Sequence, residues 1–220
     1  WAGVGEALVL RAHSMGFGGK PVDSLKHAKR ALELLPESAY PQRCHALSLI
    51  GTAERLAGNL FEAEQHFQQC LDLGAGHDCP FPMFASAHLL AGVLIRQGRL
   101  KLAERRLLEI IQIRAGSNSD NFAHLPPAIL PFSLLAEIYL QWNRLEKAEE
   151  YICIAIENGH ERDAISYCSG IFSVYARVLF AEGKPEQANE KMEESLDLAR
   201  KSSSIMEELS VRAQHASLMM

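Results

Sequence analysis

The sequence lacks the short motifs that mark most enzymes and metal-binding proteins. It contains no GxxxxGK[ST] phosphate-binding loop, no HExxH pair and no GxSxG nucleophile turn. The five cysteines are odd in number and widely spaced, and no two of them form a CxxC pair. A disulfide framework is therefore not expected, and the cysteine usage favours a reducing compartment, which we take to be the cytoplasm. We expect no catalytic activity, no cofactor and no metal.

Charge and hydropathy exclude two further classes of partner. The net charge is −5 and no dense cluster of lysine and arginine is present, so this segment is not expected to contact nucleic acid. No apolar run approaches the length of about 18 residues that a membrane span needs. With 48% hydrophobic and 22% charged residues, the chain has the composition of a folded protein.

What the sequence does contain is a repeat. Five segments begin with Gly or Asn, and their starts are 39, 40, 45 and 40 residues apart. Five positions after each start stands a small residue, and eight positions further on stands an aliphatic one. The starts are Gly19, Gly58, Gly98, Asn143 and Gly183; the small residues are Ser24, Ala63, Ala103, Ala148 and Ala188; the aliphatic residues are Leu32, Leu71, Ile111, Ile156 and Leu196. A fixed period near 40 residues indicates a repeat architecture.

Each repeat unit reads as a helical hairpin. Glycine or asparagine permits the left-handed backbone that ends one helix and turns into the next. Apolar residues then recur three and four apart, as on one face of an amphipathic helix. In four units the preceding helix also carries a small residue, twelve positions before the one in the second helix. These are Gly51, Ala91, Ala136 and Ala176.

The pattern predicts an all-α protein of the tetratricopeptide (TPR) type. We expect a TPR-like superhelix of about five helical hairpins, with one more helix from Ser204. Residues 1–220 are taken as a single α-solenoid domain, and because the first residue is Trp1 rather than Met, we expect a fragment of a larger protein. The alternative is an ordinary helical bundle, which the recurring small residues disfavour.

One stretch resembles a particular TPR subfamily. Residues 125–148 read LPPAILPFSLLAEIYLQWNRLEKA. This stretch resembles the TPR sensor region of MalT-like, LuxR-family ATP-dependent transcriptional activators, with a lead-in at Pro126 and Pro127, a Leu135-Ala136-Glu137 helix and a Trp142-Asn143 turn. The resemblance implies a bacterial sensor region that receives an inducer and helps to control self-association. The ATPase and DNA-binding modules of that family have no counterpart in these residues.

In a TPR array the first helices of the hairpins line a concave surface, and we expect this groove to bind a ligand or a partner. The predicted binding residues lie off the packing stripe of these helices. They are His45, Ser48, Thr52, Arg55, His88, Arg96, Ser133, Glu137, Gln141, Ser173, Arg177 and Phe180. The arginines suit carboxylate or phosphate groups. Alternatively the residues form a solvated surface, and Glu137 and Arg177, at equivalent places in successive units, neutralise each other.

Three functional hypotheses remain open from the sequence. The first is a ligand-sensing and protein-interaction region of a LuxR/MalT-type regulator, in which an inducer or a protein partner controls self-association. The second is a scaffold that binds an extended peptide in its concave groove without any small ligand. The third is an enzyme or metal-binding domain on helical hairpins, which no motif supports.

Overall fold

The computed structural model describes residues 2–77, 79–116, 129–160, 165–201 and 205–218, and these residues form eleven helices and no strand. The helices fall into two compact units, Trp1–Ile110 and Ile111–Met220. The all-α prediction is confirmed for the described residues, while the assignment of the whole chain to one domain stays a prediction. Within the same residues, none of the helices has the length and apolar character of a membrane span.

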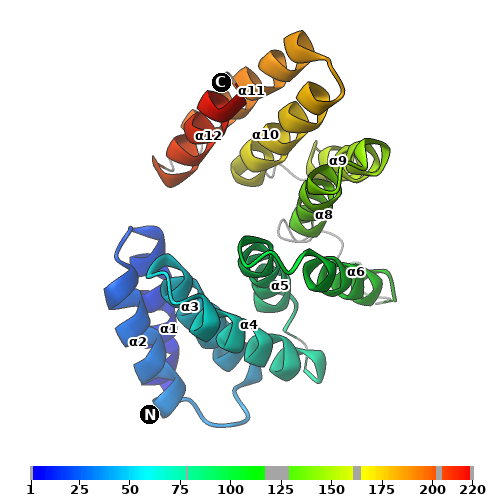
Figure 1. Cartoon of the computed structure of the whole chain (residues 1–220). Helices are drawn as coiled ribbons and strands as arrows, with labels where there is room; N and C mark the ends of the chain where they lie inside the picture. The colour runs from blue at the N-terminus through cyan, green and yellow to red at the C-terminus, as the bar shows by residue number, and fades with distance from the viewer. Residues whose placement is uncertain (1, 78, 117–128, 161–164, 202–204, 219–220) are drawn as a thin grey trace. The chain divides into compact units, whose positions relative to one another are not determined.

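The first unit is built from hairpins of consecutive helices (Figure 1). Helix α1 packs against α2 and α3 against α4, while α2 contacts α3 and α4 contacts α5. The first helices of successive hairpins also touch, because α3 contacts both α1 and α5. The helices are α1 (Ala2–Phe17), α2 (Pro21–Leu34), α3 (Tyr40–Leu56), α4 (Leu60–Ala75), α5 (Pro80–Arg96) and α6 (Leu100–Gly116), which continues past the boundary of the unit.

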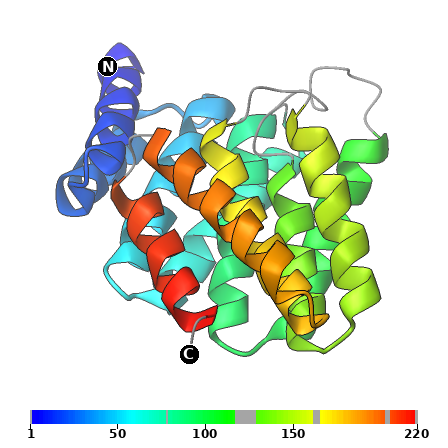
Figure 2. The same cartoon turned by 90° about the horizontal axis from the view of Figure 1, so that it is seen from above.

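The second unit repeats the arrangement. Helix α8 pairs with α9 and α10 with α11, and α12 packs against both α10 and α11. Figure 2 shows α11 in orange beside α12 in red. The bounds are α8 (Leu130–Gln141), α9 (Leu145–His160), α10 (Ile165–Ala181), α11 (Pro185–Lys201) and α12 (Ile205–Leu218). The helix predicted from Ser204 is therefore present, whereas Pro126 and Pro127 lie outside the described residues.

The hairpin turns form where the Gly and Asn positions predicted them. At Gly58, with φ of +86°, the amide donates to the Arg55 carbonyl at 3.2 Å, and the Asn59 amide donates to the Glu54 carbonyl at 2.9 Å. This pair of bonds is the Schellman motif, which satisfies the last carbonyls of a helix by placing one residue in the left-handed region. The same two bonds close all five turns, including the one at Asn143, with φ of +54°.

The small residues lie where the two helices of a hairpin cross. Ala63, Ala103 and Ala148 are fully buried. At Gly51 a Cβ would come within 2.7 Å of the buried Phe67 ring, so only glycine fits there without movement. Ser24 is also buried, and its hydroxyl donates to the Ala12 carbonyl at 2.8 Å. The crossings fix the rotation of each first helix and hence the face that it exposes.

Three of the five thiols belong to the core of the first unit. Cys44, Cys70 and Cys79 are buried in one cluster with Leu47, and the Cys70 thiol donates to the Cys44 carbonyl at 3.3 Å. Burial raises the pKa of the other two thiols, Cys153 and Cys168, which are only partly buried in the second unit. The described residues contain no disulfide and no group of ligands suited to a metal ion.

The turn geometry predicts which glycine substitutions are costly. A Cβ at Gly58 would meet no atom within 4 Å, so the cost of Gly58→Ala is conformational. We expect it to lower the free energy of unfolding by about 1 kcal/mol, since alanine disfavours the left-handed region. Gly76→Ala is the matched control, because Gly76 is equally open but right-handed, at φ −93°. Urea denaturation of both variants is the measurement, and equal losses would contradict this assignment.

Candidate functional site

His45 lies at the junction of three first helices in the first unit. Its Nε2 is 3.0 Å from Nδ1 of His13 on α1, and the two rings meet edge to face. On its other side the His45 ring meets Phe81 of α5, also edge to face, with centroids 6.5 Å apart. The predicted binding residue is thus held in a fixed orientation between two neighbouring helices.

The histidine pair is electrically neutral near pH 7. Burial, and secondly the His13 ring, lowers the pKa of His45 to about 4. Burial also lowers the pKa of His13. In a bond between two neutral rings, one nitrogen donates and the other accepts. The pair therefore offers polar atoms and aromatic surface to the exposed face but no positive charge at neutral pH.

Two arginines supply the positive charge of this face. Arg55, in the last turn of α3, is partly buried, and its Nε has no hydrogen-bond partner among the described residues. Burial, and secondly the neighbouring Arg96 of α5, lowers the pKa of Arg55. Neither arginine joins an ion pair in the part of the chain that the structure describes. The arrangement places two like charges close together without a carboxylate.

The carboxylate nearest in sequence to Arg55 is engaged elsewhere. Glu54 is buried, and its two oxygens accept from Lys29 Nζ at 3.1 Å and from Asn59 Nδ2 at 2.7 Å. The bond from Asn59, chiefly, lowers the pKa of Glu54 and keeps it ionised, with Lys29 adding to the effect. Because Glu54 connects α3 to α2 and to the start of α4, its charge is not available to Arg55.

In the second unit an arginine of a first helix is paired with a carboxylate of the neighbouring first helix. The Arg177 guanidinium of α10 donates to Glu137 of α8 at 3.1 Å, with 28% and 24% of these side chains exposed. These two residues occupy the same place in successive hairpins, and the structure contains the ion pair between them that this equivalence suggested. The charges of Glu137 and Arg177 therefore neutralise each other, whereas Arg55 and Arg96 of the first unit have no carboxylate partner among the described residues.

The predicted serines are buried rather than exposed. Ser48 and Ser133 are each 6% exposed, and Ser173 is 0% exposed. The Ser133 hydroxyl donates to the Leu130 carbonyl at 2.9 Å, and the Ser173 hydroxyl donates to the Gln214 side chain of α12. Ser173 therefore packs against α12, and the buried Ser48 and Ser133 do not line an open surface.

The other predicted residues differ in what they present. Thr52 is partly buried, and its hydroxyl donates to the Ser48 carbonyl of its own helix at 2.8 Å. His88 is partly buried on α5, while Gln141 and Phe180 are exposed on α8 and α10. Six of the twelve predicted residues belong to each unit, and their shared role as a binding surface stays a prediction.

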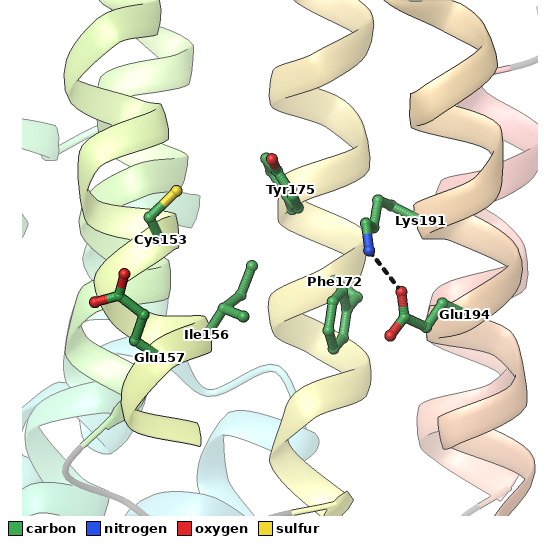
Figure 3. A pocket seen from close by; sticks show the side chains of 7 residues that line it. All are labelled: Cys153, Ile156, Glu157, Phe172, Tyr175, Lys191 and Glu194. Atoms are coloured by element: carbon green, nitrogen blue, oxygen red, sulfur yellow. Dashed lines mark hydrogen bonds and ion pairs between the residues drawn. The ribbon is translucent and has the colours of Figure 1, made fainter. Parts of the chain in front are cut away.

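A pocket in the second unit was not predicted from the sequence. It measures about 240 Å³ and lies among α9, α10 and α11 (Figure 3). Its lining combines aromatic, aliphatic, thiol and charged side chains, which are Cys153, Ile156, Glu157, Phe172, Tyr175, Lys191 and Glu194. Phe172 and Tyr175 form part of the apolar stripe of α10, so periodicity alone marks them as packing residues.

The short His77-Asp78-Cys79 sequence is not assembled as a metal site in the described residues. Cys79 points into the core with Cys44 and Cys70, whereas the exposed His77 ring stacks on Tyr40. Asp78 lies outside the described residues.

The histidine pair predicts how stability depends on pH. The pKa of His45 is about 4 when folded and near its ordinary value of 6.5 when unfolded, so the unfolded chain binds more protons between these values. The stability that the neutral His45 contributes is fully present above pH 6.5, and it falls as the pH drops toward 4, by roughly 3 kcal/mol. Urea denaturation from pH 4 to 8 should show this slope, reduced in His45→Gln. A His45 ring that titrates near 6.5 by NMR would contradict the buried, neutral assignment.

Known proteins resemble this chain at the level of family and fold. Residues 5–220 match the MalT-like TPR region. The HTH-type transcriptional regulator MalT of Vibrio cholerae is 23% identical over 204 residues, which cover 90% of this chain and 22% of that protein. The MalT of Yersinia pestis is 27% identical over 144 residues, which cover 64% of this chain and 15% of the relative. The chain thus spans less than a quarter of the length of these relatives.

Solved structures share the fold. The Rap conjugation gene regulator of plasmid pLS20, in complex with the Phr* peptide, superimposes with a TM-score of 0.75 at 17% identity, covering 93% of this chain and 56% of that one. A Podosopora anserina protein with nearly identical TPR-like repeats gives a TM-score of 0.62 at 18% identity, covering 90% and 95%. At these identities the likeness establishes a common TPR-like fold and nothing finer.

The five Schellman turns, the buried small residues at each helix crossing and the match over residues 5–220 agree with one another. We conclude that the chain belongs to the MalT-like TPR family.

Proposed function

We propose that this chain is the ligand-sensing and protein-interaction region of a LuxR/MalT-type transcriptional regulator. Occupation of the exposed face of its first helices by an inducer or a protein partner would control self-association of the regulator. Family membership and the naming of the relatives as HTH-type transcriptional regulators support the proposal. Binding of DNA would reside outside this segment.

The observation that carries the proposal is the uncompensated charge at Arg55 and Arg96. A partly buried guanidinium without a partner destabilises the free protein, because it loses hydration and gains no hydrogen bond in return. The second unit satisfies its arginine internally through Glu137. In the first unit the missing acceptor would come from the ligand, as a carboxylate or phosphate group.

An alternative function is a scaffold that binds an extended peptide and no small molecule. One observation favours it: the Rap regulator of similar fold is solved with a bound peptide. Arginines on a helical face suit an acidic side chain or a terminal carboxylate of such a peptide. The two functions share the anionic group and differ in how much of the exposed surface the ligand covers.

Binding of an anionic ligand should depend on both arginines. A thermal-shift screen would compare sugars, sugar phosphates, nucleotides, dicarboxylates and acidic peptides, since a ligand that binds the folded state raises Tm. For a ligand found in this way, Arg55→Gln or Arg96→Gln should weaken binding by about ten-fold or more, as expected for hydrogen bonds to charged groups.

Arg99→Gln is the matched control, because the Arg99 guanidinium is engaged by Glu64 at 2.7 Å. It should leave binding unchanged. Ligand binding that survives both Arg55→Gln and Arg96→Gln would overturn the anionic site. A small ligand should lose most of its affinity through one of these substitutions, whereas a peptide should lose affinity gradually over several positions. Sedimentation with and without the ligand would then test control of self-association.

Arg55 should also oppose stability in the absence of ligand. Arg55→Met keeps the length of the side chain and removes the unpartnered Nε, so we expect the unliganded protein to be at least as stable, by up to about 1 kcal/mol. Urea denaturation measures this effect. A clear loss of stability would indicate that Arg55 serves the fold rather than a ligand.

A further inference from the structure

The pocket of the second unit combines features that the exposed helix faces do not have. Figure 3 shows Phe172 and Tyr175 projecting from α10, with Cys153 and Glu157 of α9 on one side and Lys191 and Glu194 of α11 on the other. Aromatic rings and carboxylates thus face the same space of about 240 Å³. The pocket lies on the α9 and α11 side of α10, whereas the ion pair of Arg177 extends toward α8.

The protein already places one of its own cations in this environment. The Lys191 Nζ lies 5.2 Å from the centroid of the Phe172 ring and 2.8 Å from an oxygen of Glu194. An ammonium over an aromatic face is attracted by the negative charge of that face, and a carboxylate beside it adds a charge-assisted hydrogen bond. The position of Lys191 therefore indicates that this part of the pocket favours an ammonium group.

The remaining charged residue of the lining, Glu157, is negative. Glu157 and Glu149 join no ion pair among the described residues, whereas Glu182 is paired with Lys184 at 2.8 Å. Burial is the main reason why the pKa of the Cys153 thiol is raised. The nearby carboxylates add to this effect; they are Glu149, Glu157 and Glu182.

The pKa of the neighbouring Tyr175 phenol is also raised. Burial is the main cause, followed by Cys153 and Glu149. The positive charges of Lys191 and Lys184 oppose this change. One lysine in the lining, Lys191, faces the two carboxylates of Glu157 and Glu194, so the pocket carries a net negative charge.

We propose that this pocket binds an alkyl cation, a primary ammonium or guanidinium group, held between the rings of Phe172 and Tyr175 and the carboxylate of Glu157. The apolar stem of such a group would pack against Ile156, and its charge would meet a carboxylate that has no cation of its own in the described structure. The source of the cation is either a free amine or a lysine or arginine side chain of a partner. This site is independent of the anionic site of the first unit.

Lys191 makes the proposal testable, because its ammonium competes with the ligand for the Phe172 ring. Lys191→Gln would remove the ammonium from the Phe172 ring and break the ion pair with Glu194, so the variant should bind a cationic probe more tightly, by about two- to five-fold. Glu157→Gln should weaken binding by a similar factor. Glu150→Gln is the matched control, because Glu150 is an exposed carboxylate on the same helix α9 and does not line the pocket.

The probe is 1,5-diaminopentane, titrated by calorimetry into the intact chain at low and high salt, with 1-pentanol as the neutral counterpart. We expect binding of the diamine alone, weakened by salt because the attraction is electrostatic. A capped lysine tripeptide and its arginine counterpart form the second arm, and tighter binding of a tripeptide than of the diamine would assign the cation to a protein side chain.

Three results would overturn the proposal. One is equal binding of 1-pentanol and the diamine, the second is an affinity for the diamine that Lys191→Gln leaves unchanged or lowers, and the third is an equal loss in Glu150→Gln and Glu157→Gln. Far-ultraviolet circular dichroism and Tm are measured for each variant, so that a loss of binding is not confused with a loss of folding.

Discussion

The close crossing of the two helices in each hairpin is the contact on which the other features depend. Fully buried small residues such as Ala63 and Ala148 let the helix backbones approach, and at Gly51 even a methyl group would meet Phe67. A crossing this tight fixes the rotation of both helices, because turning either one would bring a larger side chain into the contact. The exposed face of every first helix, and the height of each residue on it, follow from that single constraint.

The two units share this geometry but differ in whether the charges on their first helices are paired. In the second unit, successive first helices carry a carboxylate and a guanidinium at equivalent heights, and Glu137 and Arg177 satisfy each other. In the first unit, Arg55 and Arg96 come together while Glu54 is committed to Lys29 and Asn59. The second unit thus pairs these charges internally, whereas the first unit leaves two arginines without a carboxylate in the part of the chain that is described. Functional sites are often found where the free protein is not at its most stable.

Sequence reasoning was reliable where a local rule decides the structure. The left-handed turn at Asn143 and the buried small residues followed from backbone sterics and helical periodicity, which act within one hairpin. It was less informative where two hairpins meet. The burial of Ser173 against Gln214 and the contact of His45 with His13 depend on how one hairpin is set against the next, and periodicity carries no signal for that setting. The pocket beside Phe172 arises from three helices and was missed for the same reason.

The buried thiols of this protein can report how often its helices separate. Cys44, Cys70 and Cys79 share the core of the first unit, whereas Cys153 and Cys168 are only partly buried in the second. A thiol reagent reaches a fully buried sulfur only when the surrounding helices separate, so its rate of labelling follows the frequency of that separation. Mass spectrometry of partly labelled chains would therefore measure how often the first unit opens, with the partly buried Cys153 and Cys168 as an internal reference that needs no engineered probe.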